Sequence, residues 1–445
     1  MNFSIIQKSQ FEGSTRIDAE YYQPEYFIDF AKGNWKFIGE VLKKCQYGLS
    51  LAMNDDKKGY PMFKMDNIED AFLFDNKVRF ADVSEIIFKN FQLEKNDVLF
   101  NRVNSEEFVG RTGIYKLDLE STFASYLIKL QPDKAEILPD YLNIFLNSKF
   151  GLRQIKKYAR RAVNQANVNA EELKQFKIAV LPMPIQKEIE KLSNKSWEES
   201  QKSESLYQQA ERLLLEELGL TDYEKIESLS VVINLSEVEN SRRMDAEYFQ
   251  AKYEKLVSKL KENNSKLLGE VIENIPAKFE ANKKPNDKFN YVELSNINSG
   301  AINGFTEVLG KEAPNRAKRI LKTNDVIVST VEGSLDKVAL VAKEQKGFLA
   351  SNGFFQFRSK EVLPEVLLVM AKSIIFQFQL EKRCAGTILT AVPKETIKDM
   401  VIPILPKETQ EKISNLVKQS FESRQKAKEL LEEAKRRVEE MIESK

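Results

Sequence analysis

The chain has 445 residues and a formal net charge of +1, because 68 Lys and Arg are matched by 67 Asp and Glu. With 42% hydrophobic and 30% charged residues it has the composition of a globular protein, which excludes a largely disordered chain. Histidine is absent, and this excludes Ser–His–Asp and Cys–His nucleophilic catalysis, histidine acid–base chemistry and ordinary zinc sites. The balanced charge gives no support for a uniformly basic nucleic-acid binder, so any basic face must be offset by acidic surface elsewhere.

The two cysteines, Cys45 and Cys384, lie one in each half of the chain and at non-equivalent places. No disulfide framework follows from them, and we expect a reducing, cytoplasmic environment. The first residues, MNFSIIQKSQ, lack the apolar segment of a signal peptide, and no apolar run approaches the length of a membrane span. We therefore expect no membrane association.

The first half begins with strand-like segments, in which β-branched and aromatic residues are separated by turn signals; they start at Phe63, Asn96, Thr112 and Tyr126. Apolar residues at helical spacing then predict a helix over about Pro139–Tyr158. A closing strand, FKIAVLPMP, is ended by prolines. A long helix is predicted over Gln186–Leu218, ended by Gly219 and roughly 50 Å long.

The second half repeats this order of elements. Strand-like segments start at Tyr291, Asn324, Lys337 and Gly353, a helix follows from Leu363, and DMVIPILP closes the globule. A second long helix follows Pro406. Strands first and a helix late indicate an α+β globule in each half.

Both long helices carry a stripe of residues at heptad spacing, which is the pattern of a coiled coil; in the second helix the stripe is apolar with two polar interruptions. In the second helix the stripe is Ile413, Val417, Ser420, Arg424, Ala427, Leu431, Ala434, Val438 and Met441. In the first helix it is weaker and rich in serine: Ile189, Ser193, Ser196, Ser200, Ser203, Tyr207, Ala210 and Leu214. The small residues would allow a partner helix to approach closely. A two-fold relation between the repeats would make the two helices an antiparallel pair, whereas the alternative is that each packs on its own globule.

Sequence landmarks show that the chain is an internal duplication. RIDAEYYQ from Arg16 returns as RMDAEYFQ from Arg243, ILPD from Ile137 returns as VLPE from Val362, and LP-x-x-x-Q at Leu181 returns at Leu405. Each half is far longer than a solenoid repeat, so the chain is a duplicated domain and not an array. We predict globules at residues 1–182 and 221–405 and spacer helices at residues 183–220 and 406–445. A molecule of this kind suits a target that is itself roughly two-fold, of which duplex DNA is the commonest.

Active-site motifs are missing. The sequence contains no G-x-G-x-x-G, no phosphate loop, no Cys pair for a metal and no Asn-Pro-Pro-aromatic motif of the adenine methyltransferases. We therefore predict no catalytic residue, no metal site and no bound cofactor. The best-kept repeated segments, Asp18–Tyr21 and Asp245–Tyr248, favour a docking role over DNA contact, because aromatic residues at that spacing usually pack against a neighbour.

Loops with basic and amide side chains are the candidates for DNA contact, since Arg and Lys bind phosphates and guanine edges and Asn or Gln can bind adenine. The candidates in the first half are Lys57, Lys58, Arg102, Asn104, Arg111, Arg160, Arg161 and Gln165. Those in the second half are Lys283, Lys284, Arg316, Arg319, Ser329, Thr330, Arg383 and Thr387. Any one of them could simply be solvated, but basic segments recur at equivalent places in both halves.

These features together resemble the specificity subunit of type I restriction–modification systems. The segments that carry the resemblance are FKIAVLPMPIQKEIEKL from Phe176 and DMVIPILPKETQEKISNL from Asp399, in which a strand, a Pro-rich link and a Gln precede a long helix. NDVLFNRVN at Asn96 looks like the family's G-D-[IVL]-L-[FV]-[ST]-R strand. Family members commonly carry a G-T-Q-x-N-I segment before the closing strand, and this chain departs from it: Asn164-Gln165 lacks the glycine and Gly386-Thr387 lacks the glutamine.

The resemblance implies two target-recognition domains on a helical spacer, each reading one half of a split DNA sequence. It also implies two methyltransferase subunits and restriction/translocase subunits as partners, which would bring S-adenosylmethionine, ATP and magnesium. Two alternatives remain open: a stand-alone nuclease or methyltransferase with a hidden site, and a coiled-coil scaffold that binds only proteins. Incubation of the chain with DNA plus Mg²⁺ or S-adenosylmethionine tests the first, and salt-dependent DNA binding tests the second.

Overall fold

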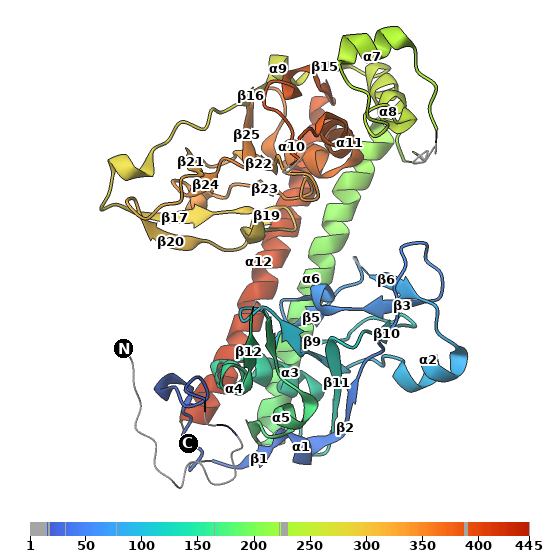
Figure 1. Ribbon diagram of the computed structural model, residues 1–445. Coiled ribbons are helices and arrows are strands. Elements are labelled where there is room, and N and C mark those ends of the chain that lie inside the picture. Colours follow the sequence, from blue (N-terminus) through green and yellow to red (C-terminus); the bar gives the residue numbers. More distant parts are fainter. Residues whose placement is uncertain are drawn as a thin grey trace. The chain divides into compact units, whose positions relative to one another are not determined.

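A computed structural model describes residues 16, 18–31, 33–76, 78–163, 165–221, 223, 230–386 and 390–444. The chain divides into two compact units (Figure 1). Unit 1 comprises Met1–Lys202 and Ser423–Lys445, and unit 2 comprises Ser203–Glu422. Each unit therefore contains one globule together with parts of both long helices.

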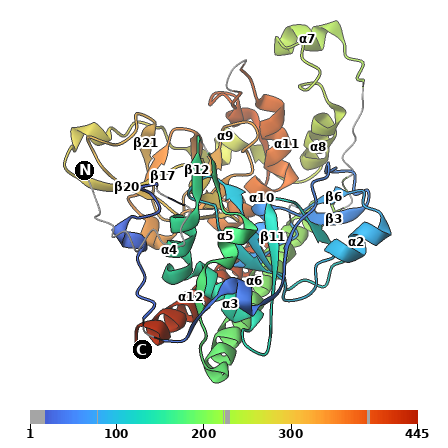
Figure 2. The ribbon, with the colours of Figure 1, turned by 60° about the horizontal axis from the view of Figure 1, so that its bottom comes forward.

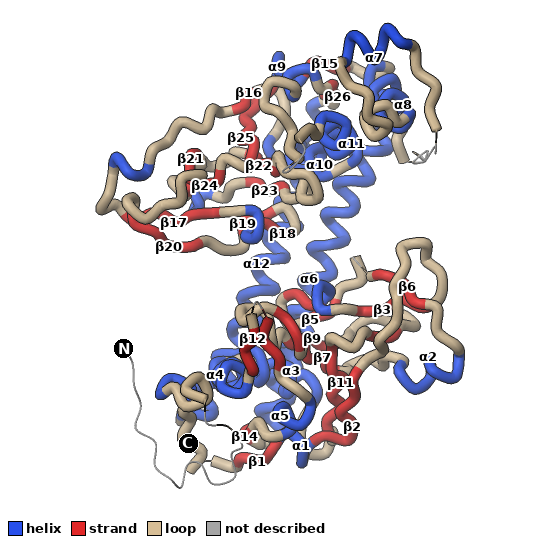
Figure 3. Tube along the Cα trace, viewed as in Figure 1, coloured by secondary structure: helices blue, strands red, loops and turns tan. Residues whose placement is uncertain are grey.

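Unit 1 is built on a six-stranded sheet of order β2-β11-β7-β9-β5-β4, with three smaller sheets of order β10-β3-β6, β12-β13-β8 and β1-β14. Figure 3 marks the helices and strands along the Cα trace, and Figure 2 shows the ribbon in a turned view. The strands are β1 (Trp35–Phe37), β2 (Leu42–Tyr47), β3 (Tyr60–Phe63), β4 (Ile68–Glu69), β5 (Phe72–Leu73), β6 (Arg79–Ala81), β7 (Val98–Asn101), β8 (Val103–Asn104), β9 (Thr112–Ile114), β10 (Thr122–Phe123), β11 (Leu127–Pro132), β12 (Arg160–Ala162), β13 (Gln165–Asn167) and β14 (Lys177–Ala179). The helices are α1 (Ile38–Val41), α2 (Glu85–Phe91), α3 (Pro139–Asn147), α4 (Lys149–Tyr158), α5 (Ala170–Lys174) and the start of α6 (Met183–Glu217).

Unit 2 has sheets of order β16-β25-β22-β23, β20-β17-β24-β21, β18-β19 and β15-β26. Its strands are β15 (Ser265–Leu267), β16 (Ile272–Asn274), β17 (Lys288–Val292), β18 (Ile297–Asn298), β19 (Ala301–Ile302), β20 (Thr306–Leu309), β21 (Ala317–Ile320), β22 (Val326–Ser329), β23 (Val338–Leu340), β24 (Leu349–Ser351), β25 (Phe354–Ser359) and β26 (Val401–Pro403). Its helices are α7 (Leu235–Ser241), α8 (Ala251–Lys261), α9 (Leu268–Val271), α10 (Pro364–Lys372), α11 (Ile374–Arg383) and the start of α12 (Lys407–Glu443). The α+β class and the duplication are confirmed.

The repeated glutamines fix each long helix to its globule. Gln186 is fully buried near the start of α6, where it accepts from Leu138 N at 2.8 Å and donates to Leu181 O at 2.9 Å. Gln410 makes the same two bonds at the start of α12, with Leu363 N at 2.9 Å and Leu405 O at 3.1 Å. The LP-x-x-x-Q pattern is therefore a structural anchor in both units.

The two long helices pair antiparallel within each unit, as the heptad pattern predicted. In unit 1, Arg437 binds Glu188 at 3.1 Å, and Ser196 Oγ donates to Ala427 O at 2.8 Å further along. In unit 2, Ser420 Oγ donates to Ser203 O at 2.8 Å. Hydroxyls can reach the backbone of the facing helix only if the helices approach closely, so the serine-rich seam has the role expected of small residues.

Two predicted elements differ from the structure for a local reason. The helix expected over Pro139–Tyr158 is broken at Ser148, whose backbone is extended, into α3 and α4. A Cβ on Gly151 would lie 2.4 Å from Phe145 O, so glycine permits this tight corner. The strand expected from Phe63 ends there, because the Asn67 side chain accepts from Lys64 N at 2.9 Å and closes a 3₁₀ turn.

Candidate nucleic-acid interface

A small sheet in unit 1 gathers candidate residues that are far apart in the sequence. In the β12–β13–β8 sheet, Ala162 lies opposite Gln165, Arg160 lies opposite Asn167, and Ala166 lies opposite Asn104. Side chains directly opposite each other share a face of an antiparallel sheet, and successive residues alternate between faces. Arg160, Gln165 and Asn167 therefore share one face, on which Arg160 and Gln165 are exposed.

The opposite face of this sheet is partly covered. Arg161 donates from Nε to Glu106 at 2.7 Å and from Nη2 to the Tyr26 hydroxyl at 3.4 Å, and its side chain is 22% exposed. Asn104 Nδ2 lies 3.4 Å from Met65 Sδ. These contacts hold both side chains against the globule, so the exposed face is the better candidate for DNA contact.

The carboxylate of Glu172 holds Arg160, the arginine of the exposed face, in place. Arg160 pairs through Nε with Glu172, while its side chain stays 60% exposed. Glu172 is fixed in turn by accepting from Asn169 N at 3.0 Å in the capping box of α5. Arg160 is therefore oriented before any ligand arrives, and it keeps unused donors for a phosphate or base.

The Arg102 side chain makes contacts within unit 1. Its Nε donates to Ser125 O at 2.8 Å and its guanidinium lies 5.0 Å from the centre of the Tyr47 ring. Arg111 is exposed, but its guanidinium stacks 3.9 Å from the Phe108 ring centre.

Lys57 and Lys58 lie in a different part of unit 1, on the turn that precedes β3. The Lys58 side chain is 78% exposed and lies 3.7 Å from Asp56. Lys57 has a positive φ of 58°, and Gly59 has a φ of 86°, where a Cβ would lie 2.0 Å from Ala81 O. The turn is thus a fixed loop whose lysines face solvent, which suits phosphate contact.

In unit 2, three of the candidate cations are exposed. Lys283 and Lys284 lie at a 3₁₀ turn and form exposed ion pairs with Glu280 at 3.0 Å and Asp287 at 3.8 Å. Arg316 is 60% exposed and donates to the Tyr291 hydroxyl at 3.1 Å.

Other candidates in unit 2 are placed unfavourably, and their prediction needs correction. Arg319 is 2% exposed, donates to Ile275 O, and has its pKa lowered to about 10 by burial. Ser329 is fully buried and accepts from Val331 N at 3.1 Å, and Thr330 donates to Gly353 O at 3.1 Å. Because side chains closed off in this way cannot reach DNA without rearrangement, none of the three belongs to the interface in this conformation.

Two candidates of unit 2, Arg383 and Thr387, remain. Arg383 donates to Thr396 O and Gln379 O, both at 2.9 Å, and burial lowers its pKa, so it holds the end of α11. Thr387 lies outside the described residues. Sequence reasoning missed Asn167, although the alternation of Gln165 and Asn167 along one strand would have placed it on the exposed face.

The repeated RxDAEY motif is a clip that closes against the end of a helix in both units. Arg16 donates to both Asp18 carboxylate oxygens at 2.7 Å and to Tyr158 O at 2.6 Å. In the copy, Arg243 donates to Asp245 and, at 2.9 Å, to Cys384 O. Tyr21 and Tyr248 lie beneath the guanidinium of the arginine in their own motif, so each motif packs within its own unit, as the aromatic spacing predicted.

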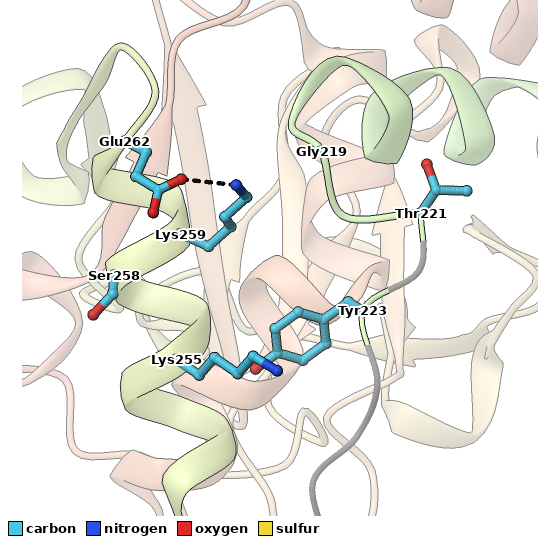
Figure 4. Close-up of a pocket in the computed structure, with 7 residues that line it drawn as sticks. All are labelled: Gly219, Thr221, Tyr223, Lys255, Ser258, Lys259 and Glu262. Carbon is cyan, nitrogen blue, oxygen red and sulfur yellow. Dashed lines mark hydrogen bonds and ion pairs between the residues drawn. The ribbon is translucent and has the colours of Figure 1, made fainter.

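A separate hollow of about 510 Å³ lies beside α8 in unit 2 (Figure 4). Lys255 and Lys259 project into it from α8, and Tyr223 and Gly219 line its other side. Lys259 is paired with Glu262 at 2.7 Å. None of the predicted DNA-contact residues lines this hollow.

Across the residues that the structure describes, no helix combines the length and apolar character needed to cross a bilayer.

Comparison with known proteins places both globules in one family. The family model for the type I restriction modification DNA specificity domain matches residues 33–194 and 260–436. The chain therefore belongs to this family, and it carries two copies of the domain. The matches begin near β1 and β15 and run into the long helices.

Individual relatives carry descriptions of the same kind. The chain is 32% identical over 182 residues to a putative type I restriction enzyme MjaX specificity subunit of Methanocaldococcus jannaschii, covering 39% of this chain and 43% of the relative. It is 26% identical over 171 residues to the EcoKI specificity subunit of Escherichia coli, covering 38% of this chain and 36% of the relative. The chain thus spans less than half the length of these curated relatives. A solved type I S subunit from M. genitalium is 15% identical, with 93% of this chain and 98% of that chain covered and a TM-score of 0.42.

Proposed function

We propose that this chain is a DNA-sequence-specificity subunit that reads a bipartite target, one half with each unit. The observation that carries the proposal is the presence of two copies of a DNA specificity domain in one chain. The two copies share their frame but present different side chains on their exposed loops. A protein of this form can read an asymmetric, split sequence.

The exposed cations and amides divide into two roles under this proposal. In unit 1, Lys57 and Lys58 contact phosphates, and Arg160, Gln165 and Asn167 contact base edges, since amide side chains match adenine and arginine matches guanine. In unit 2, Lys283, Lys284 and Arg316 are the corresponding contacts. Short-range contacts of this kind fit a net charge of +1, because only local patches need be basic.

The chain acts without chemistry of its own in this proposal. Two methyltransferase subunits and restriction/translocase subunits bind to it and bring S-adenosylmethionine, ATP and magnesium. The paired long helices serve as the spacer that sets the separation of the half-sites.

The decisive experiment is mapping of methylated bases in the source genome with and without this gene. We expect one asymmetric, split motif to lose its methylation when the gene is removed. An unchanged methylation pattern, or DNA cleavage or methylation by the purified chain alone, would contradict the proposal.

A further inference from the structure

The internal duplication allows two kinds of surface residue to be told apart. Under the proposed function, on which this inference rests, the two units read different half-sites but bind two copies of the same methyltransferase. Residues that read DNA should therefore differ between the units. Exposed residues that are identical in both units, and that no internal contact explains, are the ones suited to a shared partner.

The RxDAEY clip contains one such charged residue in each unit. The clip contacts explain why Arg16, Asp18 and Tyr21 return as Arg243, Asp245 and Tyr248. The glutamates between them, Glu20 and Glu247, are exposed. Among the described residues, neither carboxylate forms a hydrogen bond or an ion pair.

The backbone presents both glutamates in the same way. Tyr21 N donates to Asp18 O at 3.2 Å and Tyr22 N donates to Ala19 O at 3.2 Å, and the same two bonds recur with the same lengths at Tyr248 and Phe249. Each glutamate is therefore carried on a turn whose preceding aspartate is held by the arginine and whose following tyrosine is packed. A carboxylate on so fixed a turn loses little backbone freedom when it binds.

Neighbouring charges do not explain why the glutamate is kept. In unit 1, Glu20 lines a hollow together with Lys156 and Glu25. In unit 2, the residues at the corresponding positions, Glu381 and Lys252, have opposite charges and pair with each other at 3.1 Å. One cation and one anion thus exchange positions between the two units, while equivalent lysines, Lys157 and Lys382, lie over Tyr21 and Tyr248. Neither lysine forms an ion pair with the glutamate of its unit, so no ion pair among the described residues explains why the glutamate is identical in both.

We infer that Glu20 and Glu247 are equivalent docking contacts for the methyltransferase subunits. Each carboxylate accepts a charge-assisted hydrogen bond from a Lys or Arg side chain at the same position on one methyltransferase. The clip then has two tasks: it packs on the end of α4 or α11, and it presents the carboxylate to the partner.

The test uses the full chain purified with its methyltransferase, with stoichiometry measured by native mass spectrometry and affinity by titration. Glu20→Lys and Glu247→Lys should each leave one methyltransferase bound tightly and weaken the other at least tenfold, and the double variant should weaken both. Glu25→Lys and Glu237→Lys, also exposed but not shared between the units, are the matched controls and should bind two subunits normally, since the repeat has Lys252 and Gln10 at these positions.

DNA binding by the chain alone separates this inference from the proposed function. The glutamate variants should bind the specific target as the unaltered chain does, and a methyltransferase variant with the contacting cation changed to Glu should restore tight binding to them. Two tightly bound methyltransferases in the double variant would overturn the inference, as would a loss of DNA affinity with normal stoichiometry. An unaltered chain that binds neither specific DNA nor methyltransferase would instead overturn the proposed function.

Discussion

Both units bury an aspartate just before a central strand, but they neutralise it from different positions on the neighbouring strand. In unit 1, Lys129 lies 3.5 Å from Asp97, and Gln131 donates to the same carboxylate at 2.6 Å. In unit 2 the cation and the amide exchange positions. Gln356, at the position of Lys129, donates to Asp325 at 2.6 Å, and Arg358, at the position of Gln131, supplies the cation. The frame therefore keeps one cation and one amide around each aspartate, while their positions are free to exchange.

Outside this frame the two units diverge. Where unit 1 has helix α2 before its central strand, unit 2 has strand β21. Where unit 1 has the β12–β13 hairpin, unit 2 has single bridges at Ala385 and Ala391. The two units thus differ in the segments around the shared strands, as expected if each unit reads a different sequence on a common scaffold.

The largest expected effect comes from removing the second repeat. A fragment of residues 1–220, combined with methyltransferase subunits, should methylate a palindrome built from the first half-site and its inverted copy. The physical reason lies in the helices: Leu431, Ala434 and Val438 of α12 pack into the core of unit 1. In the first helix the equivalent residues are Tyr207, Ala210 and Leu214, so α6 of a second fragment can fill the same place.

Methylation mapping of the fragment complex measures this outcome. Replacing Ala210 by Glu in the fragment is the control, since a charge in the apolar seam should prevent pairing and abolish methylation. If the fragment complex still methylates the original asymmetric target, the half-site model is wrong.

The next largest effect tests the exchanged charges. Lys129→Gln removes the cation beside the buried Asp97 and should cost unit 1 about 3 kcal/mol, because a buried charge is left without its counter-ion. The double variant Lys129→Gln/Gln131→Arg restores the arrangement of unit 2 and should recover most of this loss. Both tryptophans, Trp35 and Trp197, lie in unit 1, so tryptophan fluorescence during urea unfolding reports this unit selectively.

Lys44, a neighbour of position 131, should limit the recovery of stability in the double variant. Position 131 lies opposite Lys44, whereas Arg358 lies opposite Glu273. Adding Lys44→Glu to the double variant should therefore bring stability close to that of the unaltered chain. A double variant that is no more stable than Lys129→Gln would show that the two sites are not equivalent.

Sequence reasoning succeeded where the signal is local. The heptad stripe predicted α6, α12 and their pairing, and the repeated motifs predicted the common frame. It did not find the β12–β13–β8 sheet, because strands of two or three residues pair there across a long sequence separation. Nor could it distinguish the buried Arg319 from the exposed Arg316, since only the pairing of β21 with β24 turns Arg319 inward.

A smaller effect distinguishes phosphate contacts from base contacts in unit 1. Replacing Lys57 and Lys58 by Ala should weaken binding to all sequences and lower the salt slope of binding by about one per lost phosphate contact. Gln165→Ala should instead cost about 1–3 kcal/mol on the specific target and relax the first half-site only. Binding titrations at several salt concentrations on targets with one altered half-site measure both effects, and relaxation of both half-sites by Gln165→Ala would contradict the assignment of one half-site to each unit.

The smallest expected effect is the pH dependence of the RxDAEY clip. The guanidinium of Arg16 lowers the pKa of Asp18, as Arg243 does for Asp245. A carboxyl group whose pKa is lower in the folded state stabilises the fold above its unfolded pKa of about 3.9, and this contribution is lost as the pH falls through the folded value. Asp18→Asn should therefore destabilise unit 1 by no more than about 1 kcal/mol near neutral pH, because a partly exposed pair is screened by solvent.

Tryptophan-detected unfolding at several pH values measures this effect. The gap in unfolding free energy between variant and unaltered chain should stay constant down to about pH 5 and shrink below about pH 4. Asp245→Asn is the matched control, since its clip lies in unit 2 and should leave the unit 1 signal unchanged. A gap for Asp18→Asn that persists undiminished at pH 2 to 3 would mean that the aspartate acts through its shape and hydrogen bonds and not through its charge.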